Sequence, residues 1–258
     1  VEDRPLLAAL LESLSAFTPD ERAVALELVD ARLNHPEADD YRFNAVMSEE
    51  LSRVSAALSS CLGIHADIVA PYLRDLCREE QKQRWARPIL RAEITAALGM
   101  SEPDAGSDLA GLRTRAVLDG DHFVVNGQKV WTSGAHDADV IFAFVRTDPD
   151  APKHRGLSAL VVPTDSPGLT RRPFGSIVGP DDLDFNEVFF DDVPVPAENL
   201  IGEMNEGWRV ATGSLGHERA MLWLGFAERL DDFVTHGRDA LSARGLSRDA
   251  LVLDWFGT

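Results

Sequence analysis

The residues best suited to chemistry begin with the segment Ala97–Asp108, which reads A-L-G-M-S-E-P-D-A-G-S-D. A short apolar segment ends there and leads into a loop of small residues around Gly106 and Ser107. Because small residues let the backbone come close to a ligand, this loop is a candidate binding site. Taken alone, the same letters also fit a polar β-turn.

A second candidate segment follows further along the chain. Asn126-Gly127 predicts a hairpin turn, and this turn leads to Trp131, which two hydroxyl residues, Thr132 and Ser133, follow. An aromatic ring beside two hydroxyl groups could bind a planar ligand with a polar edge. A tryptophan in isolation is more often a core residue of a β-domain.

The third candidate is Glu218, which precedes Arg219 on a predicted helix. Leu215, Leu222 and Gly225 share its helical face. A carboxylate in apolar, water-poor surroundings has a raised pKa and can act as a general base near neutral pH. The alternative is a glutamate on the helix surface, paired with Arg219.

The elements that position these residues begin with a helical zone, residues 1–93. Apolar side chains recur there at helical spacing, in Leu6–Leu14 and again in Met47–Cys61. The two cysteines of the chain, Cys61 and Cys77, lie among these apolar positions. We therefore predict that both pack in a core and take no part in redox chemistry.

Residues 94–203 are predicted to form an antiparallel β-domain, a small barrel or sandwich. Turn signals such as Asp119-Gly120 and Ser166-Pro167-Gly168 separate its short apolar segments. The expected strands are 94–100, 112–118, 122–126, 139–146, 157–163 and 185–191. Helix returns after Gly207 and is expected to run to about Leu241.

Composition limits the classes of function. The formal net charge of −18 argues against nucleic acid as the main partner, although a few N–H groups or arginines could still bind a single anion. Two cysteines fit a reduced compartment. No charged-then-apolar leader and no run of about 20 apolar residues is present, so we expect a cytoplasmic protein without a membrane span. The sequence has no Gly-x-Gly-x-x-Gly after a strand and no cluster of metal ligands, so neither a Rossmann site nor a metal site is expected.

Together the three candidate segments and Val193–Glu203, in this order and between helical zones, resemble the acyl-CoA dehydrogenase family of flavoproteins. The resemblance covers about residues 41–244. It implies an α+β multidomain fold: an N-terminal helical domain (1–93, with 1–40 divergent or shortened), a central β-domain (94–203) and the first part of a C-terminal four-helix bundle (204–258), most of which is absent.

The resemblance also implies FAD as the cofactor. Met100 and Ser101 match the position that binds the flavin pyrimidine edge, where the family usually has Thr in place of Ser101. Trp131 matches the aromatic residue beside the isoalloxazine ring, and W-T-S stands here where the family usually has W-I-T. The full set of implied FAD residues is Met100, Ser101, Gly106, Ser107, Trp131, Thr132 and Ser133.

The reaction implied by the resemblance is α,β-dehydrogenation of an acyl-CoA thioester. Glu218 matches the base that removes the α-proton in the branch containing isovaleryl- and long-chain-type enzymes, while a hydride leaves Cβ for flavin N5. Arg219 and Ser107 match residues near the acyl-CoA. An electron-transfer flavoprotein is the implied electron acceptor, and a homo- or hetero-oligomer, dimer or tetramer, is the implied assembly.

Other functions fit the same residues. One alternative is a same-fold flavin monooxygenase or acyl-carrier-protein dehydrogenase, and Glu218 favours dehydrogenation over oxygenation. Another is a non-catalytic subunit that completes a partner's site, which the missing part of the bundle supports and the intact Ser101, Trp131 and Glu218 oppose. The apolar run Leu251–Phe256 predicts an oligomer, since a soluble monomer seldom exposes such a patch.

Overall fold

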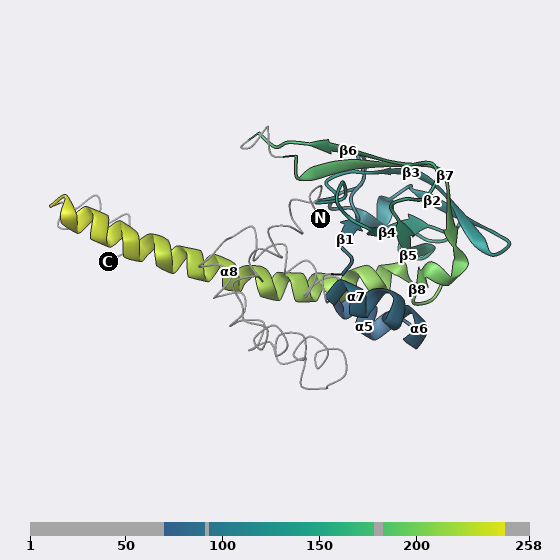
Figure 1. The fold of residues 1–258 in the computed structure, drawn as a ribbon, viewed down its shortest axis with the longest axis horizontal. Coiled ribbons are helices and arrows are strands. Elements are labelled where there is room, and N and C mark those ends of the chain that lie inside the picture. Colours follow the sequence, from purple (N-terminus) through teal and green to yellow (C-terminus); the bar gives the residue numbers. More distant parts are fainter. Residues whose placement is uncertain (1–69, 91–92, 178–182, 246–258) are drawn as a thin grey trace.

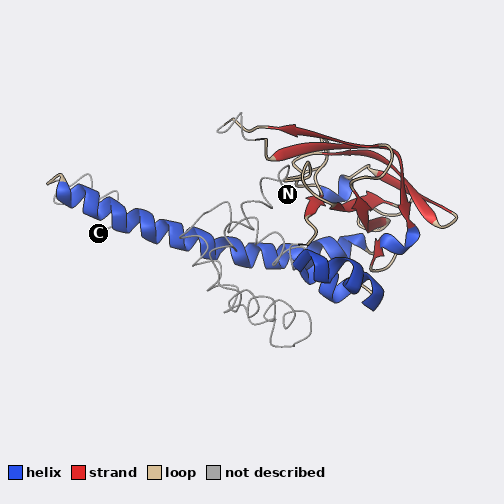
Figure 2. Cartoon of the chain, in the orientation of Figure 1, coloured by secondary structure: helices blue, strands red, loops and turns tan. Residues whose placement is uncertain are grey.

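The computed structural model of the chain describes residues 70–90, 93–177 and 183–245 (Figures 1 and 2). Helices α5 (Ala70–Leu76), α6 (Glu79–Gln81) and α7 (Arg87–Leu90), with a π-helical turn at Lys82–Ala86, precede a β-domain, and the long helix α8 (Gly207–Ala243) follows it. The strands are β1 (Ala96–Gly99), β2 (Arg115–Asp119), β3 (His122–Lys129), β4 (Val140–Arg146), β5 (Leu157–Pro163), β6 (Leu169–Phe174), β7 (Phe185–Pro196) and β8 (Leu200–Ile201).

The strands form one mixed sheet in the order β6-β7-β3-β2-β4-β5-β8, with β1 added beside β4. The expectation of an antiparallel domain is therefore only partly right. Most neighbours are antiparallel, but β1 and β2 both run parallel to β4. The reason is the connection: β1 reaches β4 only after the β2–β3 hairpin, and such a long connection allows a parallel pairing.

Strand β4 shows why the central strands form, because both of its faces are buried. Phe142 and Phe144 point to an apolar cluster shared with the helices. Ile141 and Val145, which alternate with them, point to a second cluster inside the β-domain. The second cluster also includes Phe123 of β3, so β3 and β4 face each other across it.

The helices before the sheet and the start of α8 cover the same face of the sheet (Figure 1). Tyr72 of α5 stacks on Phe142 with ring centroids 4.9 Å apart. Its hydroxyl donates to the Ala211 carbonyl of α8 at 3.5 Å. Cys77 is buried in this cluster, as predicted, and burial raises the pKa of its thiol to about 12, so the thiol stays protonated. Cys61 lies outside the described residues.

Two local predictions were wrong. Asn126-Gly127 is not a turn, because β3 continues through it with a bulge, and β7 pairs with β3 on both sides of the bulge. Gly127 has a φ of +146°, and a Cβ there would lie 2.6 Å from the Thr114 Cα. Strand β6 was not predicted, because Arg171, Arg172 and Pro173 break its apolar pattern, as is typical of an edge strand.

Helix α8 confirms the predicted return to helix, and its first turn is fixed against β5. A Cβ on Gly207 would lie 2.7 Å from the Ser158 nitrogen, so the helix can approach this closely only with glycine at that position. The helix then extends away from the β-domain (Figure 1). Within the described ranges, no further helix follows α8, so a C-terminal bundle is not evident. None of the described helices is long and apolar enough to cross a membrane.

Candidate functional site

The site is built where the end of β1 meets the end of β3. Met100 and Ser101 follow β1 directly, and the Val130 N–H, just after β3, donates to the Ser101 carbonyl at 2.9 Å. This hydrogen bond brings together the two loops that carry the predicted flavin-binding residues. The Ser101 residue is half-buried, and Met100 packs against the helix-side cluster.

The loop after Ser101 contains the polar turn that the sequence also allowed. Glu102 and Ala105 exchange two backbone hydrogen bonds, with N–O distances of 2.9 and 3.1 Å. Gly106 and Ser107 follow this turn and are exposed. Apart from its chain neighbours, no residue has an atom within 4 Å of a Cβ built on Gly106, so the backbone there is open to a ligand.

Trp131 is not a core aromatic. Its side chain is 57% exposed, and its φ is +61°, a left-handed conformation that is unusual for a bulky residue. The indole packs edge-on against Phe174 and Phe185, with ring centroids 5.1 and 5.3 Å away. A strained backbone that presents an aromatic ring to the outside is typical of a functional position.

The two hydroxyl residues after Trp131 have different environments. Thr132 is fully buried and is held through its backbone, since its N–H donates to the Asn186 carbonyl and its carbonyl accepts from Asn186 Nδ2. Its own Oγ1 is buried without a hydrogen-bond partner. Ser133 is exposed, so its hydroxyl is the one open to a ligand.

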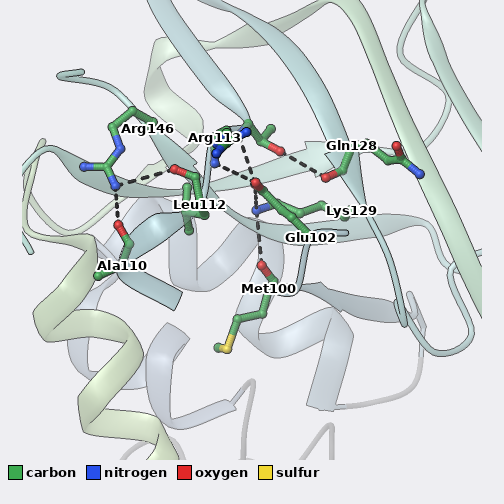
Figure 3. Close-up of polar contacts among 9 residues, drawn as sticks. Met100, Glu102, Ala110, Leu112, Arg113, Gln128, Lys129 and Arg146 are labelled. Atoms are coloured by element: carbon green, nitrogen blue, oxygen red, sulfur yellow. Dashed lines mark hydrogen bonds and ion pairs between the residues drawn. The ribbon is translucent and has the colours of Figure 1, made fainter. Parts of the chain in front are cut away.

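An ion pair that sequence reasoning missed lies beneath these loops (Figure 3). Lys129 Nζ lies 2.8 Å from Glu102 Oε1 and donates to the Met100 carbonyl at 3.2 Å. The N–H groups of Arg113 and Thr114 also donate to the Glu102 carboxylate. One signal was available, because Phe123 and Val125 point inward on β3 and Lys129 continues that alternation.

The two charges of this pair have shifted pKa values. Burial alone would raise the pKa of the Glu102 carboxyl, but the Lys129 ammonium and the hydrogen bonds that the carboxylate accepts hold it below its usual value. Burial lowers the pKa of the Lys129 ammonium to about 8, against the opposing effect of Glu102. Both groups are therefore charged at neutral pH.

The proposed base lies on α8. The backbone of Glu218 and Arg219 is helical, and α8 begins against β5. The surroundings of both side chains lie outside the described part of the structure. The structure thus brings together the predicted flavin-binding loops, and it leaves Glu218 and Arg219 as predictions.

Two family profiles match the chain. The acyl-CoA dehydrogenase N-terminal domain matches residues 37–93, and the acyl-CoA dehydrogenase middle domain matches residues 97–193, the segment that holds the loops described above. The chain belongs to the acyl-CoA dehydrogenase family. Within it, "Acyl-CoA dehydrogenase FadE29" of Mycobacterium tuberculosis is 48% identical over 154 residues, which are 60% of this chain and 39% of that protein.

Several solved structures share the fold. An acyl-CoA dehydrogenase from Geobacillus kaustophilus is 36% identical with a TM-score of 0.73, covering 83% of this chain and 58% of its own. A chain of the ChsE4–ChsE5 complex from Mycobacterium tuberculosis is 31% identical with a TM-score of 0.56, and the match covers 78% of this chain and 60% of that one. PigA, solved with FAD and proline, is 25% identical with a TM-score of 0.70, and the match covers 74% of this chain and 50% of that one. The chain spans only about two fifths of the length of FadE29.

Proposed function

We propose that this chain takes part in the FAD-dependent α,β-dehydrogenation of an acyl-CoA thioester. One observation carries the proposal: the Val130–Ser101 hydrogen bond holds the small-residue loop against the segment that presents the exposed Trp131. A polar loop edge and an aromatic face side by side form a surface that suits a planar heteroaromatic ring with hydrogen-bonding groups along one edge.

The residues present fit a bound flavin. The Trp131 indole is exposed, the backbone at Gly106 is open, and Ser133 and Ser107 expose hydroxyl groups. Met100, Ser101 and Thr132 complete the proposed set, with Thr132 acting through the backbone bonds that hold Trp131 in place. When bound, FAD would accept the hydride from the substrate Cβ.

The chain would contribute the proton transfer itself. Glu218 is the proposed base for the α-proton, because the sequence places leucines on its helical face, and apolar surroundings raise a carboxyl pKa toward neutral. Arg219 and Ser107 would contact the acyl-CoA. We further propose an electron-transfer flavoprotein as acceptor and the cytoplasm as the compartment, where a free buried thiol such as Cys77 would remain reduced.

A second candidate is a partner subunit of a heteromeric acyl-CoA dehydrogenase. Two observations favour it: Leu230 on the projecting part of α8 is 63% exposed, and one relative was solved as a complex of two named chains. In that case the chain would complete another subunit's site. A same-fold monooxygenase or acyl-carrier-protein dehydrogenase would use the same loops with a different substrate.

The visible spectrum of the purified protein tests the proposal. Bound flavin that bleaches when an acyl-CoA is added without oxygen would support dehydrogenation by this chain. Flavin that is retained only when a second family member is co-expressed would support the partner subunit. A chain that binds no flavin in either preparation would contradict both.

A further inference from the structure

The buried pair Lys129–Glu102 lies at the base of the loop that starts at Met100. Resting on the proposed function, we propose that Lys129 and Glu102 are positioning residues that fix the Met100–Ser101 backbone for the flavin edge. Neither residue is among the groups proposed to contact the cofactor or the substrate.

Lys129 acts on the loop through a direct bond. Its side chain is fully buried, and its ammonium group donates to the Met100 carbonyl at 3.2 Å while it contacts Glu102 at 2.8 Å. Figure 3 shows the ammonium between these two acceptors. Met100 is the first residue after β1, so this hydrogen bond fixes the position of the backbone from which Ser101 follows.

Glu102 fixes the other side of the same loop. One carboxylate oxygen accepts from the Thr114 N–H at 2.9 Å and from Lys129, and the other accepts from the Arg113 N–H at 2.5 Å. The carboxylate thereby joins the loop to the chain just before β2. Charge-assisted hydrogen bonds of this kind are short and directional, so they fix the position of the loop as well as stabilising it.

The loop is also held at its far end. Arg146 of β4 donates to the Ala110 carbonyl at 2.6 Å. The segment from Met100 to Ala110 is therefore fixed by charged side chains at both ends, whereas Gly106 and Ser107 between them are exposed. A loop with fixed ends and an open middle can present its backbone to a ligand without reorganising on binding.

Stability alone does not explain this pair. An ion pair with both charges buried is often no more stabilising than apolar residues of similar volume, because removing the charges from water offsets their attraction. What an apolar pair cannot replace is the bond from Lys129 to the Met100 carbonyl. Positioning and stability can therefore be separated by replacing one or both residues.

The experiment compares three variants of the chain, in whichever assembly retains flavin: Lys129→Met, the double variant Lys129→Met with Glu102→Met, and the control Lys153→Met. Lys153 forms an exposed ion pair with Asp108, which directly follows Ser107, so its loss controls for removing a positive charge near the loop. FAD titration of the apoprotein gives Kd, thermal unfolding gives Tm, and hydrogen–deuterium exchange reports on the 100–107 amides.

Lys129→Met should lower Tm and weaken FAD binding by about tenfold or more, the equivalent of one hydrogen bond to a charged group. The double variant should recover part of the lost Tm, because no charge is left unpaired although the Arg113 and Thr114 N–H groups lose their acceptor, yet keep the weak FAD binding and the faster exchange at residues 100–107. The control should match the parent chain in all three measurements.

Two outcomes would overturn the inference. A double variant that recovers FAD affinity together with Tm would make the pair purely structural. Exchange at residues 100–107 that is unchanged in both Lys129 variants would show that Lys129 does not hold the loop, and this readout needs no flavin. Failure of the proposed function would look different, since the parent chain itself would then bind no FAD.

Discussion

At the scale of single residues, Trp131 and Lys129 show which side-chain roles can be predicted from a sequence. Trp131 could be assigned an exposed role only because of its neighbours, since an isolated tryptophan is usually buried. Lys129 was missed for the opposite reason, because a charged residue is usually placed at the surface. Its burial depends on Glu102, which precedes it by 27 positions, and no local pattern announces such a pairing.

Glu218 is the residue whose role can be tested most sharply. Glu218→Gln removes the proton acceptor but keeps the size and most hydrogen bonding. If Glu218 is the base, flavin and acyl-CoA should still bind, while anaerobic flavin reduction in a stopped-flow instrument slows by about 100-fold or more.

A surface pair with Arg219 predicts a different result. Reduction would then stay within a few-fold of the parent rate, with at most about 1 kcal/mol of stability lost. That outcome would remove Glu218 from the mechanism and place the base elsewhere.

Glu102 should make the free energy of unfolding depend on pH. The pKa of its carboxyl is held below the usual 4.5, so the folded state binds this proton less tightly than the unfolded state. The resulting stability is fully present above pH 4.5 and is lost as the pH falls through the folded-state pKa. Glu102→Gln should therefore cost about 3 kcal/mol at neutral pH, as for a broken buried pair, and progressively less below pH 4.5.

Urea unfolding of the two proteins from pH 7 to pH 3 measures this difference. Glu198→Gln is the control, because Glu198 pairs with Arg84 in an exposed ion pair, and its loss should cost less than about 1 kcal/mol. A cost of Glu102→Gln that does not change with pH would argue against the lowered pKa.

At the scale of elements, the bounds of a strand were predicted best where both of its faces are buried, because such a strand is a continuous apolar run in the sequence. The prediction for β5 matched its bounds, 157–163, and that for β4 differed by one residue. Strand β6 was missed because an edge strand needs no apolar alternation. The Asn126-Gly127 turn was wrong because the β7 partner strand, which no local signal reveals, extends β3 through it.

The first turn of α8 offers a test at this scale. A Cβ on Gly207 would meet the β5 backbone at under 3 Å, whereas one on Gly213 would meet nothing within 4 Å. Gly207→Ala should therefore destabilise the docking of α8 by about 1–3 kcal/mol, as overpacking does. Gly213→Ala should be neutral or stabilise by up to about 1 kcal/mol, because alanine favours helix. Denaturant unfolding of both variants checks this, and equal effects would contradict the docking of α8 on β5.

At the scale of the whole molecule, α8 separates two regions with different burial. Its start is packed, with Val210 and Ala211 buried against the sheet face that the N-terminal helices also cover. Its later part extends beyond the β-domain and exposes Leu230 at 63% and Phe233 at 55%. Large apolar side chains exposed together on one helix favour a contact with another polypeptide segment.

We therefore predict that the chain forms an oligomer through this part of α8. Light scattering should give a mass at least twice that of one chain, and Leu230→Lys should reduce that mass while leaving the β-domain folded. Asp239→Lys, which also adds a positive charge to an exposed position of α8, should not change it. A parent chain that is fully soluble at the mass of one copy would contradict the prediction, because its apolar α8 surface would then be stable in water alone.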